Sequence, residues 1–406
     1  MGKAPARRRL VGFLLLGATV GLLGVATRAA RGRGEAARLV ASARPRNATA
    51  TNAAERPGGA PGSKPQASAS APPSAPPTPL VIVAGGDVNL GRECGQAILA
   101  DARYDPFRFM GPIWGDADVR FVNLESQLSD QGGETQSPNN RLVFTGPPGG
   151  AETLALGGVA VVSTANNHAW DYGKGALFET LDNLARAGVK KAGTGRTLAE
   201  AYEPALIEAH GHRIAVLAVT QIWNDGPIEQ HEGRKYVAWA RLARLKTALA
   251  AARKSADFVV LSYHGGVEYI DAPIDATRRF IDGALKTGLV DVVIGHHPHV
   301  PQGVGFREGR PVLYSLGNLV FAGHDWAPWT LVGFVARLEL DQERHLRVRV
   351  CPVALDGHVP KPIPAGIAES DRARAHLIAT SASVGRASVG TADARGCFPV
   401  EPTAPR

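Results

Sequence analysis

Short apolar runs rich in β-branched residues alternate with helical patterns from residue 80 onward. Runs of this length and composition are typical of strands buried on both faces. They lie at 80–84, 119–122, 159–163, 213–219, 258–263, 290–294 and 312–315. Helices are expected between them, among them 175–187, 239–255 and 275–288, and the second is amphipathic through leucines at helical spacing. This alternation predicts an α/β layered domain.

Towards the C-terminus the pattern changes. Residues 332–340 and 346–353 alternate apolar and polar positions around a charged turn, which predicts a hairpin at a sheet edge. The periodic signal fades after about residue 360. We therefore expect a folded domain over 80–360 and a loosely ordered tail over 361–406.

The N-terminal segment has a different character. Basic residues at 3–9 precede an apolar run over 10–27, and further arginines follow directly. This predicts a transmembrane signal-anchor helix within 1–33, with a cleaved signal peptide and secretion as the alternative. Residues 34–79 are rich in Ala, Pro, Ser, Gly and Thr, so they predict a disordered linker. Together these segments predict a membrane-anchored protein with an extracytoplasmic domain.

Charge is distributed unevenly along the 406 residues. The first 79 hold twelve Lys/Arg and two Asp/Glu, an excess of +10, so subtraction from the net charge of +8 leaves −2 for residues 80–406. A nucleic-acid-binding domain should itself be basic. The predicted domain is not, and we expect no nucleic-acid partner.

The three cysteines, Cys94, Cys351 and Cys397, lack the spacing of a thiolate zinc site. If the chain is exported, one pair can form a disulfide. Pairing Cys351 with Cys397 would fix the C-terminal tail to the domain. Sequence gives no distance between them, so the pairing stays open.

Polar signals fall directly after the predicted strands, where ligand sites assemble in open α/β sheets. The segments are Gly-Gly-Asp-Val-Asn-Leu-Gly-Arg at 85–92, Asn-Leu-Glu-Ser at 123–126, Ala-Asn-Asn-His-Ala-Trp-Asp-Tyr-Gly at 165–173, His-Gly-Gly-Val-Glu-Tyr at 264–269, Gly-His-His-Pro-His at 295–299 and Ser-Leu-Gly-Asn at 315–318. Taken singly, Gly-Asp or Asn-Leu-Glu is as well explained by a turn or a helix cap. Three imidazoles within 296–299 are the sharpest signal. His324 with Asp325 remains an open candidate.

Carboxylates, carboxamides and imidazoles in one place suit Zn, Mn or Fe better than Ca or Mg. Such a mixed shell is the ligand set of a one- or two-metal hydrolytic centre, in which a divalent metal activates water. The sequence therefore predicts divalent metal binding without fixing the metal.

This ordered set of motifs resembles the CapA family of poly-γ-glutamate capsule biosynthesis proteins. All six motifs occur in order over roughly residues 80–325, with Gly265 where the family usually has Trp. The family in turn is similar to the calcineurin-like metallophosphoesterases. That similarity implies a four-layer α/β/β/α metallophosphoesterase-like sandwich.

The resemblance also implies residue roles. Metal ligands would be Asp87, Glu125, Asn167, His264, His297 and His299. Asn89 stands where a histidine ligand is expected, and either Asn123 or Glu125 would take the place of the bridging aspartate. His168 would be the catalytic histidine, and Arg92 would pair with an anionic substrate group. Substrate-binding positions would be Asn123, Asn166, Glu268, His296 and Asn318.

Two functions follow as hypotheses. The first is a metal-dependent hydrolase or transferase at the cell surface, acting on poly-γ-glutamate or a related acidic polymer beside membrane proteins of capsule synthesis. The second is a non-catalytic, polymer-binding component of a capsule synthesis or export complex, in keeping with the altered Asn89 and Gly265 positions. A plain phosphodiesterase acting on a small substrate is a third, weaker alternative.

Overall fold

The structure, a computed structural model, describes residues 79–341, 343–385 and 387–403. The predicted anchor at 1–33 and nearly all of the predicted linker lie outside this part of the chain. No helix among the described residues is both long enough and apolar enough to span a membrane. The anchor therefore stays a prediction.

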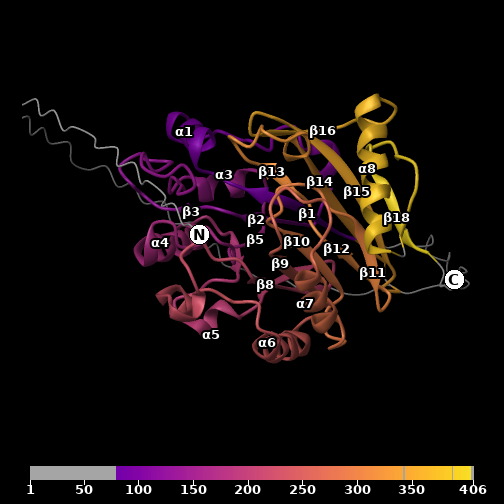
Figure 1. The fold of residues 1–406 in the computed structure, drawn as a ribbon, viewed down its shortest axis with the longest axis horizontal. Helices are drawn as coiled ribbons and strands as arrows, with labels where there is room; N and C mark the ends of the chain where they lie inside the picture. The colour runs from indigo at the N-terminus through magenta and orange to yellow at the C-terminus, as the bar shows by residue number, and fades with distance from the viewer. Residues whose placement is uncertain (1–78, 342, 386, 404–406) are drawn as a thin grey trace, which may run out of the picture. The chain divides into compact units, whose positions relative to one another are not determined.

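Two sheets form the centre of the fold (Figure 1). The larger has the order β17-β18-β15-β14-β1-β2-β5-β6, with β13 beside β1 and β16 beside β15. Its strands are β1 Leu80–Val88, β2 Val119–Leu124, β5 Val161–Ser163, β6 Lys190–Ala192, β13 Asn318–Val320, β14 Val332–Leu340, β15 Leu346–Asp356, β16 Val359–Pro362, β17 Ala387–Val389 and β18 Phe398–Pro402. The smaller has the order β11-β12-β10-β9-β8-β7. Its strands are β7 Ala205–Ala209, β8 His212–Thr220, β9 Phe258–His264, β10 Val292–His296, β11 Val304–Arg307 and β12 Arg310–Leu313.

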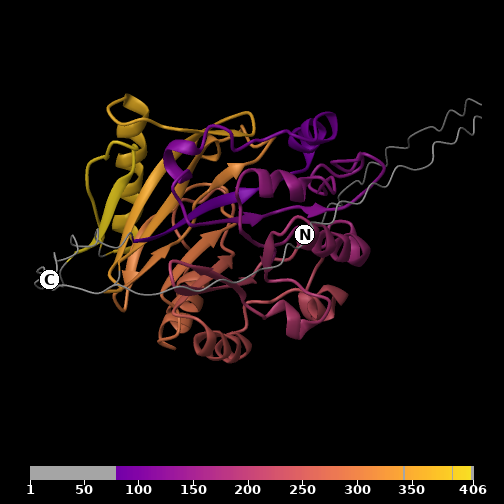
Figure 2. The same ribbon diagram turned by 180° about the vertical axis from the view of Figure 1, so that it is seen from behind.

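Helices cover the outer faces of both sheets, and the same layering is seen from behind in Figure 2. The helices are α1 Arg92–Ala100, α2 Gly111–Trp114, α3 Gly150–Leu156, α4 Gly173–Arg186, α5 Leu198–Ala201, α6 Leu242–Ser255, α7 Asp275–Leu285 and α8 Ala368–Val384. Short elements complete the described chain: strands β3 Gln127–Leu128 and β4 Thr145–Gly146, and the 3-10 turns η1 Ile228–Gln230, η2 Glu232–Lys235 and η3 Pro328–Leu331.

Side-chain alternation along the strands separates three apolar layers. On β1, Ile82 packs into the core between the sheets, whereas Val81 and Val83 pack beneath the helices of the larger sheet. On β9, Val260 joins the central core and Leu261 packs beneath α6 and α7. The result is an α/β/β/α arrangement, which explains why the core strands read as continuous apolar runs.

The C-terminal segment differs from expectation in two respects. Residues 361–406 are not a loose tail where the structure describes them, because they include α8, β17 and β18. The buried face of α8 mixes Ala373 and Leu377 with Thr380 and Ser381, so it lacks a strong hydrophobic period. The 332–353 hairpin is not at the sheet edge either, since β18 pairs with β15 beyond it.

A disulfide between Cys351 on β15 and Cys397 just before β18 fixes this segment to the larger sheet. The two cysteines are 46 residues apart, and both are fully buried. The third cysteine, Cys94, is a free thiol whose burial raises its pKa to about 12. A buried thiol of such high pKa is a poor nucleophile in the folded protein.

Removal of this disulfide in a Cys351→Ala/Cys397→Ala variant should lower the free energy of unfolding by roughly 2–5 kcal/mol, because the unfolded chain regains loop entropy. Urea denaturation of the oxidised wild type and the variant measures the difference. Reductant during unfolding should bring the wild type to the variant's midpoint and leave the variant unchanged. Equal midpoints under oxidising conditions would contradict the assignment.

Candidate metal centre

Strand register brings the predicted polar residues to one edge of the sandwich. In the larger sheet, Asp87 pairs with Asn123 of β2 and with Asn318 of β13, all in parallel register. In the smaller sheet, His264 of β9 pairs with His296 of β10, again in parallel register. Because parallel strands end at the same edge, side chains distant in sequence become neighbours there.

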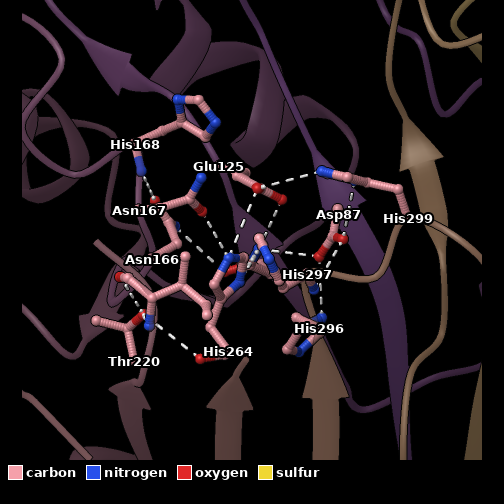
Figure 3. A network of polar contacts seen from close by, with 12 residues as sticks. Asp87, Glu125, Asn166, Asn167, His168, Thr220, His264, His296, His297 and His299 are labelled. Atoms are coloured by element: carbon pink, nitrogen blue, oxygen red, sulfur yellow. Dashed lines mark hydrogen bonds and ion pairs between the residues drawn. The ribbon is translucent and has the colours of Figure 1, made fainter. Parts of the chain in front are cut away.

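Hydrogen bonds link the sheets at this edge, as Figure 3 shows. The backbone amide of His297, which follows β10, donates to Asp87 Oδ2 at 3.2 Å. His264 Nε2 lies 2.8 Å from Asn167 Oδ1, whose loop follows β5. The polar residues after β1, β5, β9 and β10 therefore form one site.

Glu125 stands at the centre of this site. Its Oε1 lies 3.6 Å from His264 Nε2 and 3.7 Å from His299 Nε2, and Asp87 Oδ2 lies 3.5 Å from His299 Nδ1. Three overlapping groups have donor atoms all within 4.8 Å of one another: Glu125 with His264 and His297, Asp87 with Glu125 and His299, and Glu268 with His297 and His299. Glu125 belongs to the first two groups, as a carboxylate between two cation positions would.

Unsatisfied polar atoms in the cluster fit a bound cation. Glu125 Oε1 and His297 Nδ1 are both buried and have no hydrogen-bond partner among the described residues. Buried polar atoms are normally satisfied, and an ion is one recognised reason for an exception. Carboxylate and imidazole donors suit Zn, Mn or Fe. The residues present therefore fit a divalent metal.

Electrostatics favour the same interpretation. Burial, and then the nearby Asp87 carboxylate, raise the pKa of Glu125 well above its usual value. Burial lowers the pKa of His297 to about 4 and holds the pKa of His264 well below its usual value. The imidazoles are thus neutral at pH 7, the form that coordinates metals. A cation would offset the repulsion between the two carboxylates.

The backbone is strained at this edge. His297 and His299 have φ of 98° and 57°, and Arg92 has φ of 51°. Non-glycine residues seldom adopt positive φ, and those that do cluster at functional sites. At Gly86 the chain needs glycine, because a Cβ there would lie 1.9 Å from the carbonyl oxygen of Gly317.

His168 belongs to a second polar group at the rim of the cluster. Its Nδ1 lies 2.8 Å from Asp171 Oδ2, and its ring stacks on Phe144 at 4.2 Å between centroids. These contacts orient the imidazole and direct its Nε2 away from Asp171. His168, Asn167 and Glu268 line a cavity of about 340 Å³, which we call the site cavity. Glu268, one of the predicted substrate-binding residues, is exposed in this lining.

The two candidates for the bridging carboxylate position, Asn123 and Glu125, have different contacts. Asn123 Nδ2 donates to Asp87 Oδ1 at 2.9 Å and to Glu125 Oε2 at 3.3 Å. An amide binds a metal through its oxygen, and Asn123 Oδ1 accepts from Asn166 Nδ2 at 3.3 Å. The contacts therefore favour Glu125 as the ligand, with Asn123 orienting both acids.

Three other predicted substrate-binding residues are buried in the structure. Asn166 Nδ2 donates to the Leu124 carbonyl at 2.7 Å, and Asn318 Oδ1 lies 2.9 Å from His299 Nδ1. His296 is fully buried, with Nδ1 3.2 Å from Asp87 Oδ1 but without hydrogen-bond geometry. Asn166 and Asn318 thus support the site through contacts with protein, which the sequence did not reveal, whereas neither ring nitrogen of His296 has a hydrogen-bond partner among the described residues.

Arg92 lies beside the site but is engaged by the protein. Its guanidinium donates to the carbonyls of Ala322 at 2.8 Å and Arg141 at 3.0 Å. It also lies over the Phe144 ring, 4.8 Å from the centroid. The contacts are those of a side chain that holds loops together, whereas pairing with substrate was expected.

Asp171 and His324 are the residues that the sequence analysis left unassigned. Asp171 orients His168, and its position three residues further along the same motif was an available signal. His324 is buried, with its ring centroid 4.5 Å from that of His299. It comes from the loop after β13, and its position after a strand is the reason that the sequence analysis kept it as an open candidate.

The layers and the cluster together define an α/β sandwich protein with a metal-compatible site at one sheet edge. A family described as "Bacterial capsule synthesis protein PGA_cap" matches residues 81–323. The chain belongs to this family, and the predicted family resemblance is confirmed. All six motifs lie within the matched residues.

Curated relatives agree with this membership. The PGA biosynthesis protein CapA of Bacillus subtilis (strain 168) is 27% identical over 279 residues, covering 68% of this chain and 72% of that protein. The capsule biosynthesis protein CapA of Bacillus anthracis is 24% identical over 298 residues, covering 71% and 70%. Among solved structures, the calcineurin-like phosphoesterase YfkN from Bacillus subtilis is 14% identical with a TM-score of 0.43, covering 76% of this chain and 98% of that one.

The raised pKa of Glu125 predicts a pH-dependent effect of Glu125→Gln on the metal-free protein. Because the pKa of Glu125 is higher in the folded than in the unfolded protein, the carboxyl lowers the free energy of unfolding as pH rises above the unfolded pKa of 4.5. Below that pH the carboxyl is protonated in both states and this effect is absent. The variant should therefore be more stable than wild type at pH 8, by about 1 kcal/mol or more, and the difference should vanish near pH 4.

Thermal denaturation with Mn²⁺ or Zn²⁺ completes this test. The metal should raise the Tm of wild type and leave that of Glu125→Gln nearly unchanged, because a bound ion stabilises only a protein that binds it. Glu203→Gln, at an exposed glutamate, is the control and should behave as wild type. Equal metal-induced shifts in Glu125→Gln and wild type would exclude Glu125 as a ligand.

Proposed function

We propose that this protein is a metal-dependent hydrolase that acts on an acidic capsule polymer. The observation that carries the proposal is the central position of Glu125, shared by two groups of carboxylate and imidazole donors. Asp87, Glu125, His264, His297 and His299 would hold one or two divalent ions, with Asn167 beside them. A bound ion would polarise the group to be cleaved and activate water.

The residues around the cluster have complementary tasks in this proposal. Asp171 holds the His168 ring through Nδ1, so Nε2 is free to donate a proton to a leaving group as general acid. Asn123 keeps both carboxylates in place, and Asn318 orients His299. Glu268 lies at the mouth of the cluster and the site cavity, where it would meet substrate.

The substrate class is inferred from the family and the relatives. The family is named for bacterial capsule synthesis, and one relative is named for PGA biosynthesis. We propose poly-γ-glutamate or a similar acidic polymer as substrate, and membrane proteins of capsule synthesis as partners. An N-terminal anchor with the domain outside the cytoplasm would place the site at the cell surface; secretion is the alternative.

Asn89 favours a second candidate function, that of a polymer-binding component without catalysis. At the position where a histidine ligand was expected, Asn89 Oδ1 accepts from the Gly91 amide at 2.7 Å and caps a turn. Fewer strong donors at this end of β1 would weaken one of two cation positions. A binding protein on the same scaffold would keep the polymer contacts and need no general acid.

Two variants test the hydrolase against wild type. His299→Ala should lose bound metal by elemental analysis and lose turnover of the capsule polymer or of phosphoester substrates. His168→Ala should retain metal while kcat falls by about 10²–10⁴, the usual contribution of general acid catalysis. His210→Ala, at an exposed histidine in the turn before β8 and in none of the candidate metal groups, should retain both metal and turnover.

The outcomes separate the two functions. Full metal occupancy and unchanged turnover in His299→Ala would refute the hydrolase. The non-catalytic component would be favoured by two results together. Wild type and His168→Ala would restore capsule production equally in a deletion strain, and the purified protein would bind polymer in vitro without cleaving it.

A further inference from the structure

A basic cleft lies on the surface near the site cavity, between α5, the η1–η2 segment and the start of α6. It encloses about 520 Å³, within the range of roughly 300–1,000 Å³ typical of ligand sites. Five of its lining residues are basic, namely Arg196, Arg234, Lys235, Arg241 and Arg244. Glu229 is the acidic residue in the same lining. The lining thus carries a net charge of +4, against −2 for residues 80–406 as a whole.

The five bases differ in how they are paired. Arg241 pairs with Glu229, and Arg196 pairs with Asp182 at 2.5 Å. Arg234 forms no ion pair either, but it donates to the carbonyl of Glu229 at 2.7 Å. Lys235 and Arg244 have no ion-pair partner within 4.0 Å in the part of the chain that the structure describes, and both are exposed. These two side chains are therefore available to bind an anion.

An aromatic wall connects the basic cleft to the site cavity. Tyr236 lines the cleft and stacks on Trp170, with ring centroids 5.7 Å apart and planes inclined by 17°. Trp170 lines the site cavity together with His168. Trp223, also in the cavity lining, has its ring 6.4 Å from that of Trp170. The general acid candidate and the unpaired bases are thus joined by one stretch of aromatic surface.

We propose that the basic cleft binds the flanking part of a flexible polycarboxylate chain, one link of which lies at the metal centre. This inference rests on the proposed function and adds to it a second binding subsite. Guanidinium and ammonium groups suit carboxylates, and aromatic faces suit the apolar carbons between them. The negative balance of the remaining domain disfavours a broad polyanion such as nucleic acid, which would contact more than the cleft.

The test is a charge reversal in the full-length protein. Lys235→Glu/Arg244→Glu should weaken binding of fluorescently labelled long poly-γ-glutamate by about tenfold or more at low salt, because two attractive charges become repulsive. The matched control is Lys254→Glu/Lys286→Glu, which makes the same change in net charge at exposed lysines outside the cleft. The control should change affinity by less than about twofold.

Metal-free protein should be used for binding, so that the result does not depend on catalysis. If the wild type binds no metal or shows no turnover, the hydrolase proposal is refuted, whereas the binding result still stands. Equal weakening by the two double variants, or no binding of the polymer by wild type, would overturn the cleft assignment. Competition with unlabelled polyanions tests the class of ligand. If polyphosphate or single-stranded DNA displaces the labelled polymer at a lower concentration than unlabelled polymer does, the assignment of a polycarboxylate ligand is overturned.

Discussion

The structure depends on two carboxylates, Asp87 and Glu125, that are fully buried side by side. Burial of acid groups is costly unless charge or hydrogen bonds compensate. Asn123 donates to both, and the His297 amide donates to Asp87, yet Glu125 Oε1 remains without a hydrogen bond among the described residues. Neutral imidazoles surround that oxygen. A divalent cation is the species that would satisfy both the acid and the imidazoles.

The same carboxylates join the two sheets of the sandwich. Asp87 ends a strand of the larger sheet, and the His297 amide that binds it follows a strand of the smaller sheet. Apolar packing between the sheets brings these strand ends together and holds them rigidly. Of the predicted ligands, Asp87 and His264 lie on strands, whereas Glu125, Asn167, His297 and His299 lie in the loops that follow strand ends. The loops also supply His168, Glu268 and the aromatic wall.

In the proposed function, the buried site and the basic cleft would contact different parts of a charged polymer. The buried cluster is suited to chemistry at one link, because low solvent exposure strengthens each electrostatic contact. The exposed cleft is suited to holding the rest of a long chain, because surface charges attract at a distance and release readily in salt. Tyr236 and Trp170 lie between the two regions.

The sequence by itself determined the α/β alternation and the strand-end motifs at Asp87, Glu125, Asn167, His264 and 296–299, because buried strands and metal donors leave local patterns. Only the tertiary structure decided which polar residues face the cluster. It showed that Asn166 and Asn318 contact protein, favoured Glu125 over Asn123, and revealed α8, β18 and the disulfide in the C-terminal segment. The physical reason is that these features depend on contacts between segments far apart in sequence. Such contacts fix the direction of a side chain at a strand end, the pairing of two distant cysteines and the burial of a helix of small residues.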